Sequence, residues 1–468
     1  MQKLGFSQRW VDWIMACVMS VRYSVNFNGT LLDSFAPSRG LRQGDPLSPF
    51  LFLFVADGLS TLLRNNVESG DITPVKVCRS APGISHLLFA NDTLLFFKAS
   101  KTQAEKVKAI LDVYDTATGQ SLNYDKCSLV FGDACPGLIQ EEVRTTLHVT
   151  SHFFEDKYLG LPTPEGRMSK SRFQNLQTSL TKRLVQWGDG HLAQPGREVL
   201  IKSVAQALPT YIMGVFKVPF SVCDDLTRMV RNFCWGSAEG RRKMHWHGWD
   251  YLLQPKAKGG AGFGDFRMFN QALLARQAWR LLTKLDSLCA QVLKARYYPM
   301  GKLEDTIFTG NASPSWQAIS YGLELLKKGL VWRVGNGRSI RVWRDNWIPG
   351  PFSYKPISPQ GRCRIRFVSD LLNQNGSWNY GLLNEYFVEA DVQEMVKIIA
   401  SPRLDDDVIA WGPGKYGVFT VKSAYSLAFE EAHCGTDVSS SSSPSGQRKC
   451  WDFIWKSWAP PAVRNFAW

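Results

Sequence analysis

The sequence predicts an α+β fold in which a mixed N-terminal part precedes a long, mainly helical part. In the first 160 residues, short apolar runs bounded by turn residues alternate with stretches of helical periodicity. Beyond residue 160 helical spacing dominates and strand signals become sparse. At 468 residues the chain is long enough for several cores, since a domain averages about 150 residues.

The N-terminal elements begin with a helix that starts after Ser7, a typical N-cap residue. Near Val21 the pattern changes to strand-like alternation, and Asn28-Gly29 then predicts a tight hairpin turn. Asp45-Pro46 combines an N-cap with proline at the first helical position. A second helix is therefore predicted over 46–64.

A second hairpin is predicted from two apolar runs, 84–89 and 93–97, that flank Ala90-Asn91-Asp92. Because both runs are almost wholly apolar, we expect both strands to be largely buried. Helical spacing over 102–118 precedes a strand-like run over 128–131. The first 160 residues are therefore expected to be mixed α and β.

Later segments are predicted mainly as helices, for example 173–187, 197–208, 221–234 and 270–285. A block over 331–347 is rich in tryptophan and glycine, and its Asn336-Gly337 pair predicts a further hairpin. Residues 439–447 are rich in serine with proline and glycine, which is typical of a flexible linker.

Charge is concentrated in one segment of the chain. The formal net charge is +14, and residues 228–302 hold 14 Lys and Arg against 4 Asp and Glu. Polyphosphate is the natural counter-charge, because neutralising phosphates releases condensed counterions. A merely solvated basic surface is the alternative. Hydrophobic content of 44% with 21% charged residues argues against disorder and against residence in a membrane.

Ten cysteines are scattered without Cys-x-x-Cys or paired His spacing, so reduced thiols and no zinc site are expected. His245 and His247 are interpreted as ordinary surface or groove residues. The longest apolar run, 49–56, is far shorter than the ~20 residues of a membrane span, and the first residues do not resemble a signal peptide. We therefore expect an intracellular protein of the nucleus or cytoplasm that is neither secreted nor membrane-bound.

The segment 38–49 reads Ser-Arg-Gly-Leu-Arg-Gln-Gly-Asp-Pro-Leu-Ser-Pro. Its glycines would let the backbone approach a base pair closely. The string resembles motif B of reverse transcriptases, in the form typical of LINE-type (non-LTR) elements and group II intron relatives. The resemblance implies a template- and nucleotide-binding set, in which the arginines face phosphate: Arg39, Gly40, Arg42, Gln43 and Gly44. A capped loop-to-helix joint without a ligand is the alternative.

Residues 87–95 resemble motif C, the hairpin whose usual form is aromatic-Ala-Asp-Asp. In the family its first aspartate and one from motif A hold two Mg²⁺ (or Mn²⁺) ions that drive phosphoryl transfer. Position 91 is Asn91, a weaker ligand for a hard cation than a carboxylate, so Asp92 is the metal and catalytic carboxylate that remains. No motif A is visible in the 37 residues before Ser38. Metal binding is expected to be impaired and polymerisation negligible.

Residues 119–128 resemble motif D, which implies that Lys126 approaches the triphosphate as a further catalytic residue. The alternative is a surface lysine that closes a helix-to-strand turn. Segments farther along resemble the region downstream of the palm in plant elements: 158–162, 200–209, 332–347, 419–425 and 451–468. The last two resemble the start of a zinc-binding region, and because the chain stops before its Cys/His cluster we expect no zinc.

The resemblance implies a partial right-hand polymerase palm, an antiparallel sheet with helices, followed by a mainly α-helical thumb-like and C-terminal region. The expected divisions are a palm with motifs B, C and D but without fingers or motif A (1–160), a helical, basic, thumb-like region (161–330), a Trp/Gly-rich connecting region (331–438), the serine-rich linker (439–447) and a truncated zinc-binding region (448–468).

These observations support three functional hypotheses. The first is an RNA-directed DNA polymerase by family, with RNA template and DNA primer as partners, that is inactive in this copy. In the second, Asp92 and an intact copy supplied in trans restore turnover. The third is a domesticated or remnant RNA- or DNA-binding protein that uses the basic region alone, with Arg241, Arg242 and Lys243 as its contacts.

Overall fold

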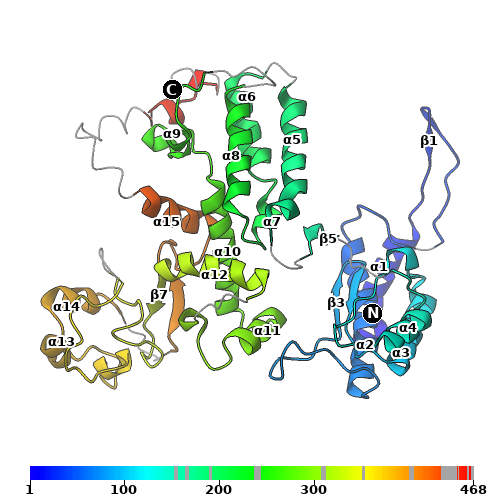
Figure 1. The fold of residues 1–468 in the computed structure, drawn as a ribbon, viewed down its shortest axis with the longest axis horizontal. Coiled ribbons are helices and arrows are strands. Elements are labelled where there is room, and N and C mark those ends of the chain that lie inside the picture. Colours follow the sequence, from blue (N-terminus) through cyan, green and yellow to red (C-terminus); the bar gives the residue numbers. More distant parts are fainter. Residues whose placement is uncertain are drawn as a thin grey trace. The chain divides into compact units, whose positions relative to one another are not determined.

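The computed structural model describes residues 1–38, 40–151, 157–163, 168–188, 192–236, 244–306, 312–349, 354–399, 405–433, 451, 453–460 and 463–464. These residues form an α+β structure of helices with small antiparallel sheets, each of two strands. The chain divides into two compact units, of which the first comprises Met1–Asp156 with Gln291–Pro299 and the second Lys157–Ala290 with Met300–Trp468 (Figure 1).

The first unit holds α1 (Gln8–Met19), β1 (Asn26–Phe27), β2 (Thr30–Leu31), α2 (Ser48–Glu68), β3 (His86–Phe89), β4 (Asp92–Leu95), α3 (Lys101–Thr118) and α4 (Gly137–Leu147). Local signals explain several boundaries. The Ser7 hydroxyl accepts a hydrogen bond from Trp10 N at the start of α1, as its sequence predicts. Gly119, in the left-handed conformation at φ 71°, ends α3.

The core of the first unit lies where α2 and α3 pack on each other and on the β3–β4 hairpin. Its buried side chains are Leu59, Leu63, Ile72, Val107 and Ile110, and Leu88 and Leu95 pack against them from the two strands. The hairpin is therefore anchored through one face, while its turn extends away from the core.

Three local expectations for this unit are wrong. The helix predicted from Pro46 begins at Ser48, because the Asp45 carboxylate accepts from Leu47 N and holds the intervening residues in a turn. The strands β3 and β4 are not largely buried, since exposure alternates along β3 and the first two residues of β4 are exposed. Residues 128–131 form no strand, because no described strand pairs with them.

The second unit holds β5 (Lys157–Tyr158), β6 (Leu161–Pro162), α5 (Gln174–Gly188), α6 (Gln194–Leu200), α7 (Thr210–Met213), α8 (Phe220–Cys234), α9 (Trp249–Leu253), α10 (Phe266–Thr283), α12 (Pro314–Gly329), β7 (Leu330–Arg333), α13 (Tyr380–Tyr386), α14 (Glu389–Val396), β8 (Val408–Trp411) and α15 (Val421–His433). Helix α11 (Leu288–Tyr297) carries residues of both units. The helices α5 and α8 match the predicted ranges within one residue, whereas α10 begins at Phe266, earlier than predicted, because Asp265 caps it.

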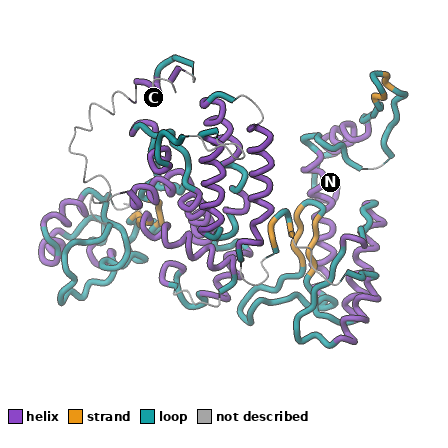
Figure 2. Tube along the Cα trace, turned by 45° about the horizontal axis from the view of Figure 1, so that its top comes forward, coloured by secondary structure: helices purple, strands orange, loops and turns teal. Residues whose placement is uncertain are grey.

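The helical core of this unit forms around α8 and α10. Helix α8 is amphipathic, with a buried stripe that includes Val222, Leu226 and Val230 at helical spacing. Helices α12 and α15 both pack against α10 and contact each other. Figure 2 shows the helices in purple and the few short strands in orange. A second cluster surrounds Trp347 and includes residues of α13 and α14.

Asn270 stabilises the connection between α7 and α8. Its buried amide donates to Met213 O at 2.7 Å and to Phe216 O at 2.9 Å, and its Oδ1 accepts from Val218 N at 2.9 Å. One polar side chain therefore satisfies three backbone groups that would otherwise be buried without partners.

Two predictions for the second unit need correction. The helix expected over 197–208 is α6 followed by a π-helical turn, Ile201–Ala205. The hairpin predicted at Asn336-Gly337 is absent from the described residues, because β7 pairs with the distant β8. The Asp407 carboxylate accepts from the backbone N–H groups of Gly335, Gly337 and Ser339, each at 2.8 Å, so these donors do not bond to an adjacent strand.

The eight cysteines within the described residues are free thiols. In the same part of the chain, no helix is both long and apolar enough to span a bilayer. The predicted linker at 439–447 lies outside the described residues.

Candidate functional site

The loop that carries the motif B residues contains a type II turn. Asp45 N lies 3.4 Å from Arg42 O, and Gly44 occupies the third turn position with φ +82°. A type II turn needs a positive φ at that position, which glycine adopts without strain. Gln43 and Gly44 are consequently exposed at the corner of the turn.

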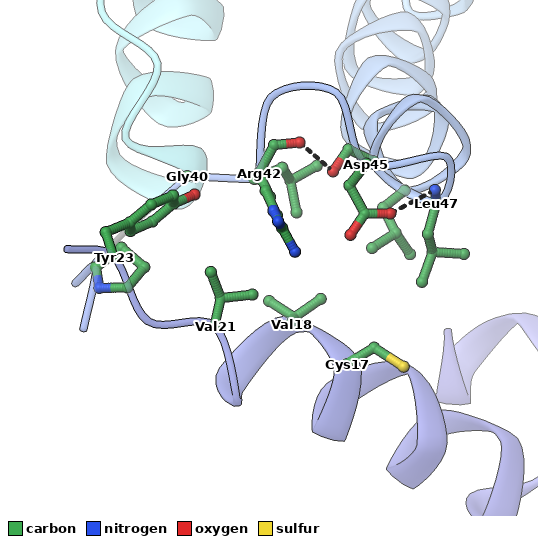
Figure 3. Close-up of a pocket in the computed structure, with 12 residues that line it drawn as sticks. Cys17, Val18, Val21, Tyr23, Gly40, Arg42, Asp45 and Leu47 are labelled. Carbon is green, nitrogen blue, oxygen red and sulfur yellow. Dashed lines mark hydrogen bonds between the residues drawn. The ribbon is translucent and has the colours of Figure 1, made fainter. Parts of the chain in front are cut away.

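The same loop is fastened to the start of α2 (Figure 3). The Ser48 hydroxyl donates to Arg42 O at 2.7 Å, and Leu47 N donates to the Asp45 carboxylate at 2.7 Å. The predicted cap is wrong in detail, because the N-cap of α2 is Leu47 and no side chain caps the helix; the loop joins the helix through these two contacts and carries an exposed glycine turn.

A small pocket of about 40 Å³ separates this loop from α1. Figure 3 shows the Arg42 side chain extending from the loop toward Val18 and Val21. Because one water needs at least ~10–15 Å³ and ligand pockets usually exceed ~300 Å³, the pocket accommodates a few waters and no nucleotide. Contact with a nucleic acid would therefore use the open face of the loop, where Gly40, Arg42 and Gln43 are exposed.

The residues of motif C form the tip of the β3–β4 hairpin. Phe89 pairs with Asp92, which leaves Ala90 and Asn91 as a two-residue turn. Ala90 has φ +49°, a left-handed conformation that costs a residue with a Cβ roughly 1 kcal/mol. Asn91 and Asp92 are both exposed.

The hairpin tip offers few ligands for a metal ion. It supplies one carboxylate, Asp92, and one neutral amide, Asn91. Among the described residues, no three His, Cys, Asp or Glu side chains lie close enough together to hold an ion. The donors present do not fit a two-ion centre, which needs several charged oxygens.

The helix that follows motif B and the strand that leads to motif C are joined by His86. Its Nε2 lies 2.9 Å from the Ser60 hydroxyl of α2, and its Nδ1 lies 2.9 Å from the Ser85 hydroxyl. Burial, and secondarily the charge of Arg64, lowers the pKa of His86 below 6.5. The neutral imidazole is therefore the form that bridges the two motifs.

Lys126 is the last residue of a 3-10 turn, Tyr124–Lys126, and is exposed. Its side chain has neither a hydrogen bond nor an ion pair with another described residue. No strand directly follows the turn in the described residues, so the helix-to-strand alternative for Lys126 is wrong in that detail. Its role at a triphosphate stays a prediction.

Comparison with known proteins decides the family. The profile of "Reverse transcriptase (RNA-dependent DNA polymerase)" matches residues 1–163. The R2 Pol polyprotein of a type-1 retrotransposable element in Popillia japonica is 26% identical over 183 residues, 38% of this chain and 29% of that protein. The chain belongs to the reverse transcriptases of LINE-type, non-LTR retrotransposons. The chain also has plant relatives.

An uncharacterized mitochondrial protein of Arabidopsis thaliana is 36% identical over 153 residues, which cover 99% of that protein and 32% of this chain. An Arabidopsis protein named for ribonuclease H is 26% identical over 322 residues, 66% of this chain and 49% of its own length. The chain thus spans about half the length of that relative.

Several residues predicted to contact nucleic acid lie outside the described residues. They are Arg39 of motif B and the basic triplet Arg241, Arg242 and Lys243. The neighbouring histidines are described: His245 stacks on Trp235 with ring centres 5.9 Å apart, and His247 stacks on Tyr251 at 4.7 Å. Both are exposed and stack on aromatic rings, as ordinary surface residues can.

Helix α10 and its C-cap carry a basic stripe that sequence reasoning did not single out. Arg276 and Arg280 lie in α10, Lys284 is its C-cap residue, and all three are exposed at intervals of four residues. Such spacing places Arg276 and Arg280 on one helix face, and Lys284 continues it at the helix end. Among the described residues, none of the three forms an ion pair with a carboxylate. The i, i+4, i+8 spacing within the basic segment is the signal that would have identified this stripe.

Proposed function

We propose that this chain is a nucleic-acid-binding reverse transcriptase whose own polymerase centre does not sustain DNA synthesis. The substrates of the ancestral activity are an RNA template and a DNA primer, with Mg²⁺ or Mn²⁺ as the ions of the reaction. Asn91 at the tip of the β3–β4 hairpin is the observation that carries the proposal. It stands where the family motif has its first aspartate.

The hairpin tip carries too little negative charge for the metal ions of the reaction. Two divalent ions and a triphosphate require several negatively charged oxygens, and the hairpin tip supplies a single carboxylate. Losing about 4 kcal/mol of transition-state stabilisation slows a reaction roughly a thousandfold. Asp92 cannot compensate, because it is the adjacent residue of the same motif and already belongs to the expected set.

Primer extension on an RNA template tests the catalytic part of the proposal. The unmodified chain and Asn91→Asp are compared with Mg²⁺ and with Mn²⁺, and Asn91→Gln serves as the uncharged control. We expect no extension by the unmodified chain or by N91Q, and extension by N91D would identify position 91 as the main defect. Extension by the unmodified chain would refute the proposal. If N91D also fails to extend the primer, restoring this one carboxylate is insufficient for DNA synthesis.

For the fold, we propose that the first unit corresponds to part of a polymerase palm and that residues 161–330 correspond to a thumb-like region. In this scheme α10 lies in the thumb-like region, and its basic stripe supplies phosphate contacts. Exposed positive charges without a carboxylate partner among the described residues favour this role, because no such ion pair has to be broken before phosphate binds. Nearby Arg267 is less suited, since it is already paired with Asp224.

Salt dependence of RNA binding tests the basic stripe. Replacing Arg276, Arg280 and Lys284 by alanine should lower the slope of log affinity against log salt by about 2, because each phosphate contact on a single strand contributes ~0.7. A control triple variant removes three exposed charges elsewhere in the same unit: Arg338, Lys415 and Lys422. Equal slopes for the two variants would contradict a specific role for α10.

A further inference from the structure

The end of the chain packs beside α9 within the second unit (Figure 1). We name residues 451–464 the C-terminal strap; its described residues are 451, 453–460 and 463–464. Lys256 Nζ lies 3.8 Å from the ring centre of Trp455. Trp451 covers Gly259 so closely that a Cβ on that glycine would lie 2.9 Å from the indole nitrogen. The two tryptophans are four residues apart, so the strap docks through paired aromatic rings.

The surface beneath the strap is rigidly built. Lys256 pairs with Glu198 at 2.9 Å, and the same carboxylate pairs with Lys202 at 2.6 Å. Lys202 also donates to Ala261 O at 2.6 Å, which ties the cluster to the glycine-rich loop that precedes α10. Two lysines share one carboxylate, so the cluster keeps an excess of positive charge. The Lys256 ammonium is thereby held in place for a planar partner.

Gly259 provides backbone without a side chain near the Lys256 ammonium. Its φ of +85° and its contacts with the Tyr251 hydroxyl and Trp451 leave no room for a side chain. Lys258 is exposed immediately beside it. Single-stranded nucleic acid can bind to such a surface. A base can stack over a fixed ammonium as an aromatic ring does, and phosphates can lie against a second, exposed lysine beside uncovered backbone.

We propose that the C-terminal strap is an autoinhibitory element that competes with single-stranded RNA for the surface formed by Lys256, Lys258 and Gly259. This inference rests on the proposed nucleic-acid binding and adds a means of regulating it. With the strap docked, Trp455 occupies the position over Lys256 that a base would take. Release of the strap opens this surface, which lies in the same basic segment as α10.

RNA affinity of the full chain tests the proposal. The probe is a labelled oligouridylate of roughly 16 nucleotides, at the upper end of common site sizes, measured by fluorescence anisotropy at several salt concentrations. The released variant carries Trp451→Ala and Trp455→Ala. The matched control is Trp458→Ala, because Trp458 lies in the same strap but is fully exposed. Circular dichroism shows whether each variant keeps its helices.

We expect the released variant to bind the probe about tenfold more tightly, as for a site that is open in roughly a tenth of free molecules. The Trp458 variant should bind like the unmodified chain. A synthetic peptide of sequence 451–464 should weaken probe binding by the released variant, whereas the same peptide with both docking tryptophans replaced by alanine should not. The peptide competition remains informative if the double substitution perturbs folding slightly.

Unchanged or weaker binding by the released variant would overturn the autoinhibitory role, because the tryptophans would then be neutral or part of the RNA site. Failure of the peptide to compete would equally overturn it. If neither the unmodified chain nor the released variant binds the probe in a salt-dependent way, the proposed nucleic-acid binding itself fails. The two failures are therefore distinguishable.

Discussion

The close crossing of α10 and α12 depends on Gly322, which makes Gly322→Ala a sharp test of how the second unit is packed. A Cβ at this position would lie 2.5 Å from the carbonyl oxygen of Leu274 and closer still to the peptide between Leu274 and Ala275. Ordinary contacts to a methyl carbon exceed 3.4 Å. The obstacle is backbone within a helix, so no change of side-chain rotamer can relieve it.

Two opposing effects set the expected change in the free energy of unfolding. Forcing an extra methyl group into a packed core costs up to about 3 kcal/mol, and replacing glycine by alanine inside a helix returns about 1 kcal/mol. We therefore expect Gly322→Ala to lower the free energy of unfolding of this unit by about 2 kcal/mol. Gly58→Ala is the matched control, because Gly58 also lies inside a helix but has open space around it. That variant should stabilise α2 by about 0.5–1 kcal/mol.

Hydrogen exchange read out by mass spectrometry is the appropriate assay, because the chain has two compact units and a single global transition is not assured. Peptides from α10 and α12 should exchange faster in Gly322→Ala, while peptides from α2 remain unchanged. Unaltered or stronger protection of both helices would refute the argument that the crossing has no room for a side chain.

Two further predictions concern buried polar contacts. Asn270→Ala should destabilise the second unit by about 3 kcal/mol, measured as lost protection of the segment between α7 and α8, because three buried backbone groups lose their partner. Acidification should weaken the contact between α2 and β3, because the pKa of His86 is lowered in the folded chain. The unfolded chain takes up the proton first, so the folded chain loses stability as the pH falls below 6.5. Protection of β3 from hydrogen exchange should change less over that pH range in His86→Gln.

Helices with strong local signals were predictable from the sequence. Ser7 caps α1, Gly119 ends α3, and the apolar spacing of 221–234 matches α8 within a residue. These features depend on neighbours within one or two helical turns, so a short window of sequence contains the relevant information. The β3–β4 hairpin was likewise predictable, because its turn and both strands are contiguous in the chain.

The candidate site was predictable in part. The order of the residues is enough to show the resemblance to motifs B and C and to mark Asn91 as a departure from motif C. The sequence did not show that the glycine turn lies over a pocket too small for a nucleotide. It also did not show which cations of the basic segment are paired, because partners such as Asp224 for Arg267 come from another helix.

The sequence by itself determined the family, the helical periods and the missing carboxylate at the hairpin tip, since each is a property of residue identity and short spacing. Tertiary structure alone decided that β7 pairs with β8 and that Trp455 rests on Lys256. Both contacts join segments separated by long stretches of chain. Closing such loops has an entropic cost that depends weakly on their length, so the packing of the rest of the molecule selects the partner.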